Sequence, residues 1–200
     1  LNQRGMVRDI GFTLHAGEVL GISGLMGAGR SELARILFGL DPHESGEIRI
    51  AGAPVPVPSP AACMARGMAF LTEDRRAEGL MMEAPITDNI ALASLPAFGA
   101  GWMRLIERTR LGDAVERVSA AVRINARDLE RTLVKNLSGG NQQKAVIGKW
   151  LLHQPRVFML DEPTRGIDVG AKYEVYKIIN QLAADGTGVL LISSEIEELT

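Results

Sequence analysis

A glycine-rich stretch close to the N-terminus has the residue types and the spacing of a loop that binds phosphate. Residues 24–31 read Gly-Leu-Met-Gly-Ala-Gly-Arg-Ser, which fits the pattern G-x-x-x-x-G-[K]-[ST] except that Arg30 replaces the lysine. Glycine lets backbone N–H groups turn toward one centre, and a helix that begins directly after the loop adds a partial positive charge. We therefore expect phosphate binding here, with Ser31 as a Mg²⁺ ligand. The alternative is a glycine-rich turn that binds nothing.

The arginine at position 30 bears on catalysis more than on binding. An arginine can hold a phosphate through two parallel hydrogen bonds, but its planar fork does not replace a compact ammonium group between two phosphate groups. The predicted nucleotide-binding residues are Gly24, Gly27, Ala28, Gly29, Arg30, Ser31 and Glu32.

Two adjacent carboxylates follow a short apolar run of strand length. The run is Val157–Leu160, and Asp161 and Glu162 come directly after it. Ligands of open parallel sheets lie at the carboxyl ends of the strands. We expect Asp161 to hold Mg²⁺, directly or through water, and Glu162 to polarise an attacking water. A capped loop after a strand is the alternative, and the phosphate-loop pattern upstream favours the catalytic interpretation.

A second group of residues suited to anion binding lies in the segment 137–144, which reads Leu-Ser-Gly-Gly-Asn-Gln-Gln-Lys. A helix is expected to follow, because Val146, Ile147, Trp150 and Leu151 recur at helical spacing. Ser138, Gly139 and Gly140 would then present backbone N–H groups at a helix N-terminus. A serine-capped helix without a ligand is the alternative.

The apolar patterns around these motifs predict a parallel sheet with a helical insertion. A helix is expected from Arg30 to about Phe38, and helical signals run from Ile86 to about His153 with glycine-rich breaks at 99–101 and 139–140. A proline-rich bend covers residues 54–60, and a helix is expected to begin at Ser193. Strands are expected at Glu18–Ser23, Gly46–Ile50, Gly67–Leu71, Val157–Leu160 and Val189–Ile192.

Composition excludes several other classes of protein. The chain has 200 residues, a net charge of −2, 46% hydrophobic residues and one cysteine. These values are typical of a globular domain, and they argue against a disordered tail, a disulfide scaffold and a general basic surface for nucleic acid. No apolar run approaches the length of a membrane-spanning helix. Because Leu1 is not an initiator Met and the expected last helix is short, we expect a piece of a longer polypeptide.

Taken together, these motifs resemble those of the ABC-transporter ATPases. The phosphate loop, the segment at 137–144, the strand end Asp161-Glu162 and the loop Gly166-Ile167-Asp168 follow that family's order and spacing. The resemblance implies an α/β fold of the P-loop NTPase (RecA-like) type: a parallel-sheet core with an ABC-type antiparallel β part and an inserted helical subdomain. It implies one nucleotide-binding domain over 1–200, with its core at 1–85 and 154–200 and a helical signature subdomain at 86–153.

The same resemblance assigns roles to further residues. Asp168 stands at the D-loop position, Glu73 at the position of the Q-loop glutamine, and Ser194 at the position of the switch histidine. Glu73 and Ser194 therefore depart from the family's usual residues, as Arg30 does. These departures fall in one nucleotide site, whereas the signature is intact. Its residues are Leu137, Ser138, Gly139, Gly140, Asn141 and Gln142.

Distinctive strings narrow the resemblance to the second, C-terminal nucleotide-binding domain of bacterial importers of ribose, galactose, xylose or arabinose. They include Thr72-Glu73-Asp74-Arg75-Arg76 and the segment 163–172. The implied ligands are ATP and Mg²⁺. The implied partners are a second nucleotide-binding domain earlier in the same polypeptide, membrane permease subunits and, indirectly, a periplasmic sugar-binding protein, at the cytoplasmic face of the inner membrane. ATP hydrolysis is expected in the paired assembly and only weakly from this domain alone.

Three other functions are alternatives, and the sequence argues against the first of them. A mechanical ATPase of chromosomes or DNA repair would separate the phosphate loop and the signature by a very long coiled coil, whereas Ser31 and Ser138 are separated by a compact helical stretch. A ribosome-associated factor of the same superfamily should carry basic tethering segments. A purely regulatory module would bind nucleotide at Arg30 without hydrolysis.

Overall fold

The computed structural model describes residues 1–3, 5–25, 27–100 and 105–195. Its strands are β1 (Val19–Ser23), β2 (Arg49–Ile50), β3 (Ala53–Pro54), β4 (Met68–Leu71), β5 (Gly99–Ala100), β6 (Leu105–Ile106), β7 (Val157–Asp161) and β8 (Gly188–Ser193). Its α-helices are α1 (Arg30–Phe38), α2 (Pro60–Ala65), α3 (Ile86–Ala91), α4 (Arg108–Ala121), α5 (Gly139–Leu152) and α6 (Val169–Ala184). Shorter helical segments are the π-helical turn η1 (Arg75–Gly79) and the 3₁₀ segments η2 (Leu92–Phe98) and η3 (Val134–Asn136).

The chain divides into two compact units. The first comprises Leu1–Glu73, Pro155–Pro163 and Ile179–Thr200, and the second comprises Asp74–Gln154 and Thr164–Ile178. None of the described helices is long and apolar enough to cross a membrane.

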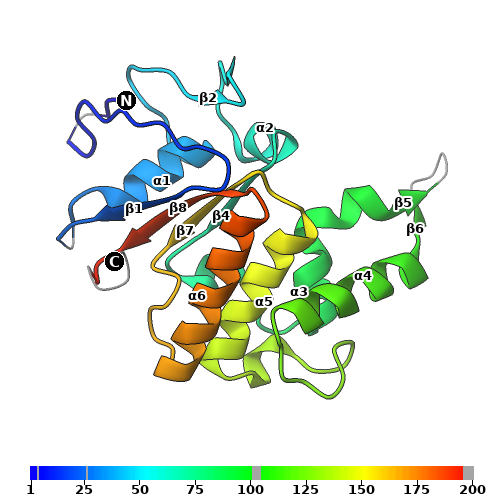
Figure 1. The fold of residues 1–200 in the computed structure, drawn as a ribbon. Coiled ribbons are helices and arrows are strands. Elements are labelled where there is room, and N and C mark those ends of the chain that lie inside the picture. Colours follow the sequence, from blue (N-terminus) through cyan, green and yellow to red (C-terminus); the bar gives the residue numbers. More distant parts are fainter. Residues whose placement is uncertain (4, 26, 101–104, 196–200) are drawn as a thin grey trace. The chain divides into compact units, whose positions relative to one another are not determined.

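The first unit contains a four-stranded parallel sheet in the order β1-β8-β7-β4 (Figure 1). Every residue of β8 is buried, and four of the five residues of β7 are buried, as expected of central parallel strands. β8 pairs with both neighbours, so that Leu190 lies opposite Leu20 on one side and Met159 on the other. The predicted parallel sheet is thereby confirmed.

Helix α1 packs against β4 and β7 and buries the apolar face that the sequence indicated. Ile36 is fully buried, and the Phe38 ring lies 5.6 Å from the Phe70 ring. The expected strand at Gly46–Ile50 is shorter, because only Arg49–Ile50 pairs, with β3 in an antiparallel hairpin.

The proline-rich bend predicted at residues 54–60 leads into a helix that the sequence analysis missed. Helix α2 begins at Pro60, directly after Ser59, whose side chain accepts a hydrogen bond from the Ala62 N–H. Proline at the first helical position costs no hydrogen bond, because that N–H has no intrahelical partner in any helix. Ser59 and Pro60 therefore form a start signal that the bend interpretation overlooked.

The second unit is helical, with α5 packed against α3 and α4. Ile86, Ile90, Val146 and Ile147 are buried in its core. The helical character expected for residues 86–153 is correct in outline, and the structure confirms both expected breaks. Gly99–Ala100 pairs with β6 in a short hairpin, and α5 begins at Gly139.

Residues 123–133 also leave the helical pattern. Arg123 takes a positive φ of 56°, which ends α4. The Asp128 side chain then accepts hydrogen bonds from the N–H groups of Glu130 and Arg131 and stabilises a turn instead of a further helix. The helix expected to begin at Ser193 falls largely on residues 196–200, which lie outside the described residues.

A buried lysine completes the core of the second unit. Lys149 is 8% exposed, and its Nζ donates a hydrogen bond of 2.7 Å to the carbonyl of Gly79 at the end of η1. Burial lowers the pKa of this amine to about 8. The folded protein therefore releases this proton at a lower pH than the unfolded chain does.

We predict that Lys149 makes the free energy of unfolding rise with pH in the alkaline range. Between the folded pKa of about 8 and the ordinary lysine pKa of 10.5, the unfolded chain binds more protons, so stability rises with pH. Relative to Lys149→Met, the wild-type free energy of unfolding should rise by about 1–2 kcal/mol from pH 8 to 9.5. Urea denaturation of both proteins at each pH measures this difference. A difference that stays constant over this range would contradict the prediction.

Candidate functional site

The phosphate loop lies between the end of β1 and the start of α1. Gly27 and Gly29 have φ values of 78° and 80°, a left-handed conformation that glycine adopts without strain. A Cβ atom at position 29 would lie only 2.6 Å from the Met6 carbonyl oxygen. Glycine is therefore required at position 29 for both conformation and space, and the loop leads directly into the first N–H groups of α1.

The carboxyl ends of β1 and β7 lie on the same edge of the sheet, because both strands pair in parallel with β8. This brings Ser31, in the first turn of α1, into hydrogen-bond contact with Asp161 at the end of β7. Asp161 is 2% exposed. Desolvation raises the pKa of its carboxyl group, an effect that the Ser31 hydrogen bond opposes.

The donor set at this edge fits Mg²⁺. Asp161 Oδ1 is buried and has no hydrogen-bond partner among the described residues, so a buried oxygen is left for a cation. The described residues contain no cluster of three or more His, Cys, Asp or Glu side chains that could hold a metal ion. This is the ordinary situation for Mg²⁺ at a nucleotide site, where one or two protein oxygens act together with phosphate oxygens and water. Asp161 and Ser31 would be those protein ligands.

Arg30 forms an ion pair with Glu162. Its Nη2 lies 3.6 Å from Glu162 Oε1, and both side chains are only 11% exposed. Arg30 Nη1 also donates a hydrogen bond of 2.6 Å to the Ser193 carbonyl at the end of β8. The residue that replaces the usual lysine is thus held by the carboxylate expected to polarise water and by the neighbouring strand.

The other oxygen of Glu162 is also held. Ser194 Oγ donates a hydrogen bond of 3.2 Å to Glu162 Oε2. The Glu162 backbone has a positive φ of 48°, which its N–H supports by donating to the Ile192 carbonyl at 2.9 Å. Such conformations persist where surrounding structure fixes them, and they gather at functional sites. The structure therefore brings Arg30, Glu162 and Ser194, the positions predicted from the sequence, into one cluster.

The signature segment begins α5, as its serine suggested. Ser138 is exposed, and its side chain accepts a hydrogen bond of 3.3 Å from the Asn141 N–H. Gln142 is 1% exposed and donates to the Leu137 carbonyl at 3.2 Å, which fixes the turn that precedes the helix. Helix α5 has 14 residues, so its N-terminus carries the partial positive charge of a full helix dipole.

Asp168 and the signature glycines meet within the second unit. Asp168 Oδ1 accepts a hydrogen bond of 3.0 Å from the Ala171 N–H and so caps α6. A Cβ atom at Gly140 would lie 2.6 Å from the Ala171 Cβ, and one at Gly139 would lie 3.3 Å from the Gly166 carbonyl oxygen. The two signature glycines thus allow the loop before α6 to approach the start of α5.

Glu73 lies two positions after the last residue of β4 and is exposed.

The other predicted site residues form two groups, one in each unit. Arg30, Ser31, Asp161, Glu162 and Ser194 gather in the first unit, and the signature with Asp168 gathers in the second.

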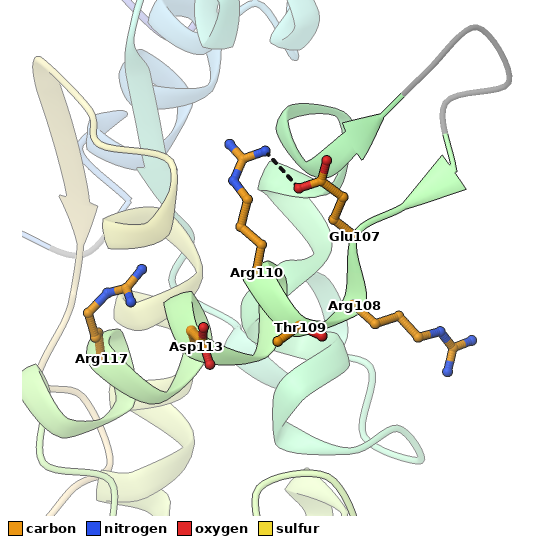
Figure 2. A pocket seen from close by; sticks show the side chains of 6 residues that line it. All are labelled: Glu107, Arg108, Thr109, Arg110, Asp113 and Arg117. Atoms are coloured by element: carbon orange, nitrogen blue, oxygen red, sulfur yellow. Dashed lines mark hydrogen bonds and ion pairs between the residues drawn. The ribbon is translucent and has the colours of Figure 1, made fainter.

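A pocket at the N-terminus of α4 lies outside these motifs. Figure 2 shows its lining, which is Glu107, Arg108, Thr109, Arg110, Asp113 and Arg117. Glu107 and Arg110 form an exposed pair at 3.5 Å, and the Arg108 side chain points away from them. None of these six residues belongs to the motifs predicted from the sequence, so this pocket is not the candidate site.

Most of the chain matches a known protein family. The family model described as ABC transporter matches residues 7–165. The chain belongs to the ABC transporter family. That match covers the phosphate loop, the signature and the strand end at Asp161 and Glu162 of this ABC domain.

Similar curated proteins are named as import ATP-binding proteins. The ABC domain is 47% identical over its whole length to the ribose import ATP-binding protein RbsA 1 of Rubrobacter xylanophilus, and it covers 40% of that protein. It is also 47% identical, over 98% of its length, to a putative ribose/galactose/methyl galactoside import ATP-binding protein of Burkholderia cenocepacia, of which it covers 37%. The chain thus spans about two fifths of the length of these relatives.

Solved structures confirm the predicted fold. A dimeric bacterial ABC transporter cassette matches 94% of this chain with a TM-score of 0.78 and 21% identity, and 79% of that cassette is covered. A nucleotide-free cassette matches the same share with a TM-score of 0.79 and 18% identity, and 75% of it is covered. The fold is that of a P-loop NTPase of the ABC type.

We predict that Gly140→Ala is destabilising because its methyl group overlaps Ala171. The free energy of unfolding should fall by about 1–3 kcal/mol, the scale of an overpacked core. Gly112→Ala in α4 is the matched control, since a Cβ there meets nothing within 4 Å; it should raise stability by about 0.5–1 kcal/mol. Urea unfolding compares the two variants. Equal effects would show that Gly140 is not in close contact with α6.

Proposed function

We propose that this domain is an energy-coupling module of an ABC importer. Its own phosphate-loop site binds Mg²⁺ and ATP but hydrolyses ATP poorly, whereas its signature completes the nucleotide site of a second domain. The observation that carries this proposal is the contrast between the two groups. Arg30 is engaged by Glu162, whereas Ser138 caps α5 with its side chain exposed to solvent.

The assembly that we propose follows the printed names of the relatives. They are called ribose, or ribose/galactose/methyl galactoside, import ATP-binding proteins. We therefore infer a monosaccharide as the imported solute, permease subunits as membrane partners and a periplasmic sugar-binding protein as an indirect partner. The second nucleotide-binding domain would precede this one in the same polypeptide, and the assembly would lie at the cytoplasmic face of the inner membrane.

The phosphate loop supplies binding through its backbone. The N–H groups of residues 27–31 lie where a helix begins, so phosphate recognition does not depend on a lysine side chain. Asp161 and Ser31 would hold Mg²⁺, which supplies charge neutralisation for the phosphate oxygens. These features support retained nucleotide binding.

Hydrolysis places stricter demands on Glu162. A water polarised by Glu162 donates a hydrogen bond to one of its carboxylate oxygens. In this chain one Glu162 oxygen pairs with Arg30 and the other accepts from Ser194. An attacking water must therefore compete with Arg30 and Ser194 for these oxygens. The intact signature, by contrast, retains the N–H groups that can stabilise charge on a phosphate in a partner's site.

We predict that the domain binds ATP in a Mg²⁺-dependent manner. Calorimetry should show binding to wild type, and Asp161→Asn should weaken the affinity for Mg²⁺–ATP by about tenfold because a charged ligand is lost. Asp113→Asn, an exposed change on α4, is the matched control and should bind like wild type. If wild type gives no binding heat at millimolar nucleotide, the loop is a glycine-rich turn without a ligand.

We also predict unequal effects of substitutions in the two groups. In the full-length protein assembled with its permease, Ser138→Arg should lower steady-state ATP turnover by about 10²-fold, the scale of losing a key anion donor. Glu162→Gln and Ser194→Ala should cost much less, because they alter a site that is already impaired. If Glu162→Gln proves as damaging as Ser138→Arg, both sites hydrolyse ATP and the asymmetry is wrong.

A further inference from the structure

One arginine that none of the motif assignments uses contacts the loop before α6. Arg75 is the first residue of η1, and its Nη1 donates a hydrogen bond of 3.0 Å to the Arg165 carbonyl. Its Nη2 lies 3.5 Å from the Gly166 carbonyl oxygen. The planar guanidinium thus reaches two successive carbonyls of the D-loop segment, which we define as residues 165–168.

The same guanidinium lies against the signature. A Cβ atom at Gly139 would be 3.1 Å from Arg75 Nη2 and 3.3 Å from the Gly166 carbonyl oxygen. Gly139 is the first residue of α5. Arg75 therefore occupies the point where the D-loop segment and the start of the signature helix meet, within the second unit.

The backbone segment that carries Arg75, η1, is held by hydrogen bonds at both of its ends. Asp74 Oδ1 accepts hydrogen bonds of 3.0 Å from the N–H groups of Arg76 and Ala77, which caps the turn. At the other end, the Gly79 carbonyl accepts the hydrogen bond of Lys149 from α5. Single π-helical turns of this kind are uncommon and often occur at functional sites. Arg75 thus projects from a segment that is anchored to α5.

We propose that Arg75 is a positioning residue that fixes the spacing between the D-loop segment and the signature. The proposal rests on the proposed function, in which the signature completes a partner's nucleotide site. A group that closes over a phosphate must be placed to within a fraction of an ångström. Arg75 meets that need because its guanidinium donates to the D-loop carbonyls and lies close beside Gly139, which sets the distance between the two segments.

The chemistry of the guanidinium suits this role better than that of other cations. Arginine presents several N–H donors in one rigid plane, so two carbonyls can be held at a fixed distance from each other. A lysine at position 75 could donate to only one carbonyl in a given arrangement. Arg75→Lys is therefore a graded test, which preserves the charge and removes the fork.

The test uses the full-length protein assembled with its permease. Arg75→Ala should lower the kcat of transport-coupled ATP hydrolysis by about tenfold or more with little change in KM, because misplacement affects closure more than nucleotide binding to the phosphate loops. Arg75→Lys should recover part of that loss. Arg131→Ala is the matched control, since its side chain in the same unit is 89% exposed, and it should leave kcat unchanged.

Hydrogen exchange distinguishes positioning from a general loss of structure. In Arg75→Ala the amides of the D-loop segment and of residues 139–141 should exchange faster, whereas the amides of α3 and of residues 143–152 in α5 should not. Unchanged kcat and unchanged exchange in Arg75→Ala would overturn the proposal, as would faster exchange throughout the second unit. Ser138→Arg separates the two claims: if it is damaging while Arg75→Ala is silent, the signature role stands and the positioning role is wrong. If Ser138→Arg is itself silent, the proposed function has failed.

Discussion

The parallel pairing of β8 with both β1 and β7 is the constraint on which the first group of site residues depends. Because the three strands run in the same direction, the loop after β1, the end of β7 and the end of β8 emerge at one edge. Arg30, Glu162 and Ser194 are far apart in sequence, and this edge brings them into contact. The complete burial of β8 stabilises the arrangement, since a shift of its register by one residue would move every side chain to the opposite face and disturb its packing.

In the proposed function, the ion pair at that edge distinguishes the phosphate-loop group from the signature group. A lysine in the phosphate loop would present one compact charge to phosphate oxygens, whereas Arg30 divides its donors between Glu162 and the Ser193 carbonyl. Nucleotide phosphates would compete with Glu162 for this guanidinium. In the second unit, Ser138 caps α5 and the signature glycines allow the loop before α6 to approach.

Local sequence was sufficient for the elements and motifs that depend on spacing alone. The apolar runs at Val157–Leu160 and Val189–Ile192 predicted central strands, and the glycine spacing predicted the turn from β1 into α1. Features that depend on side chains meeting across the fold were not predictable in this way. The Arg30–Glu162 pair and the contacts of Arg75 join distant segments, and no periodicity encodes them. The end of α4 at Arg123 was missed because a positive φ at a non-glycine residue leaves no signal in composition.

In the proposed assembly, ATP is hydrolysed at one of the two nucleotide sites and stays intact at the other. Photolabelling with azido-ATP tests it most directly, with the label placed in either the α- or the γ-phosphate. After turnover and proteolytic separation of the two nucleotide-binding domains, the label on each domain is counted. We expect this domain to retain label from both the α- and the γ-labelled nucleotide, because its bound nucleotide stays ATP. The partner domain should retain label only from the α-labelled nucleotide. Equal loss of the γ-label from both domains would contradict this expectation.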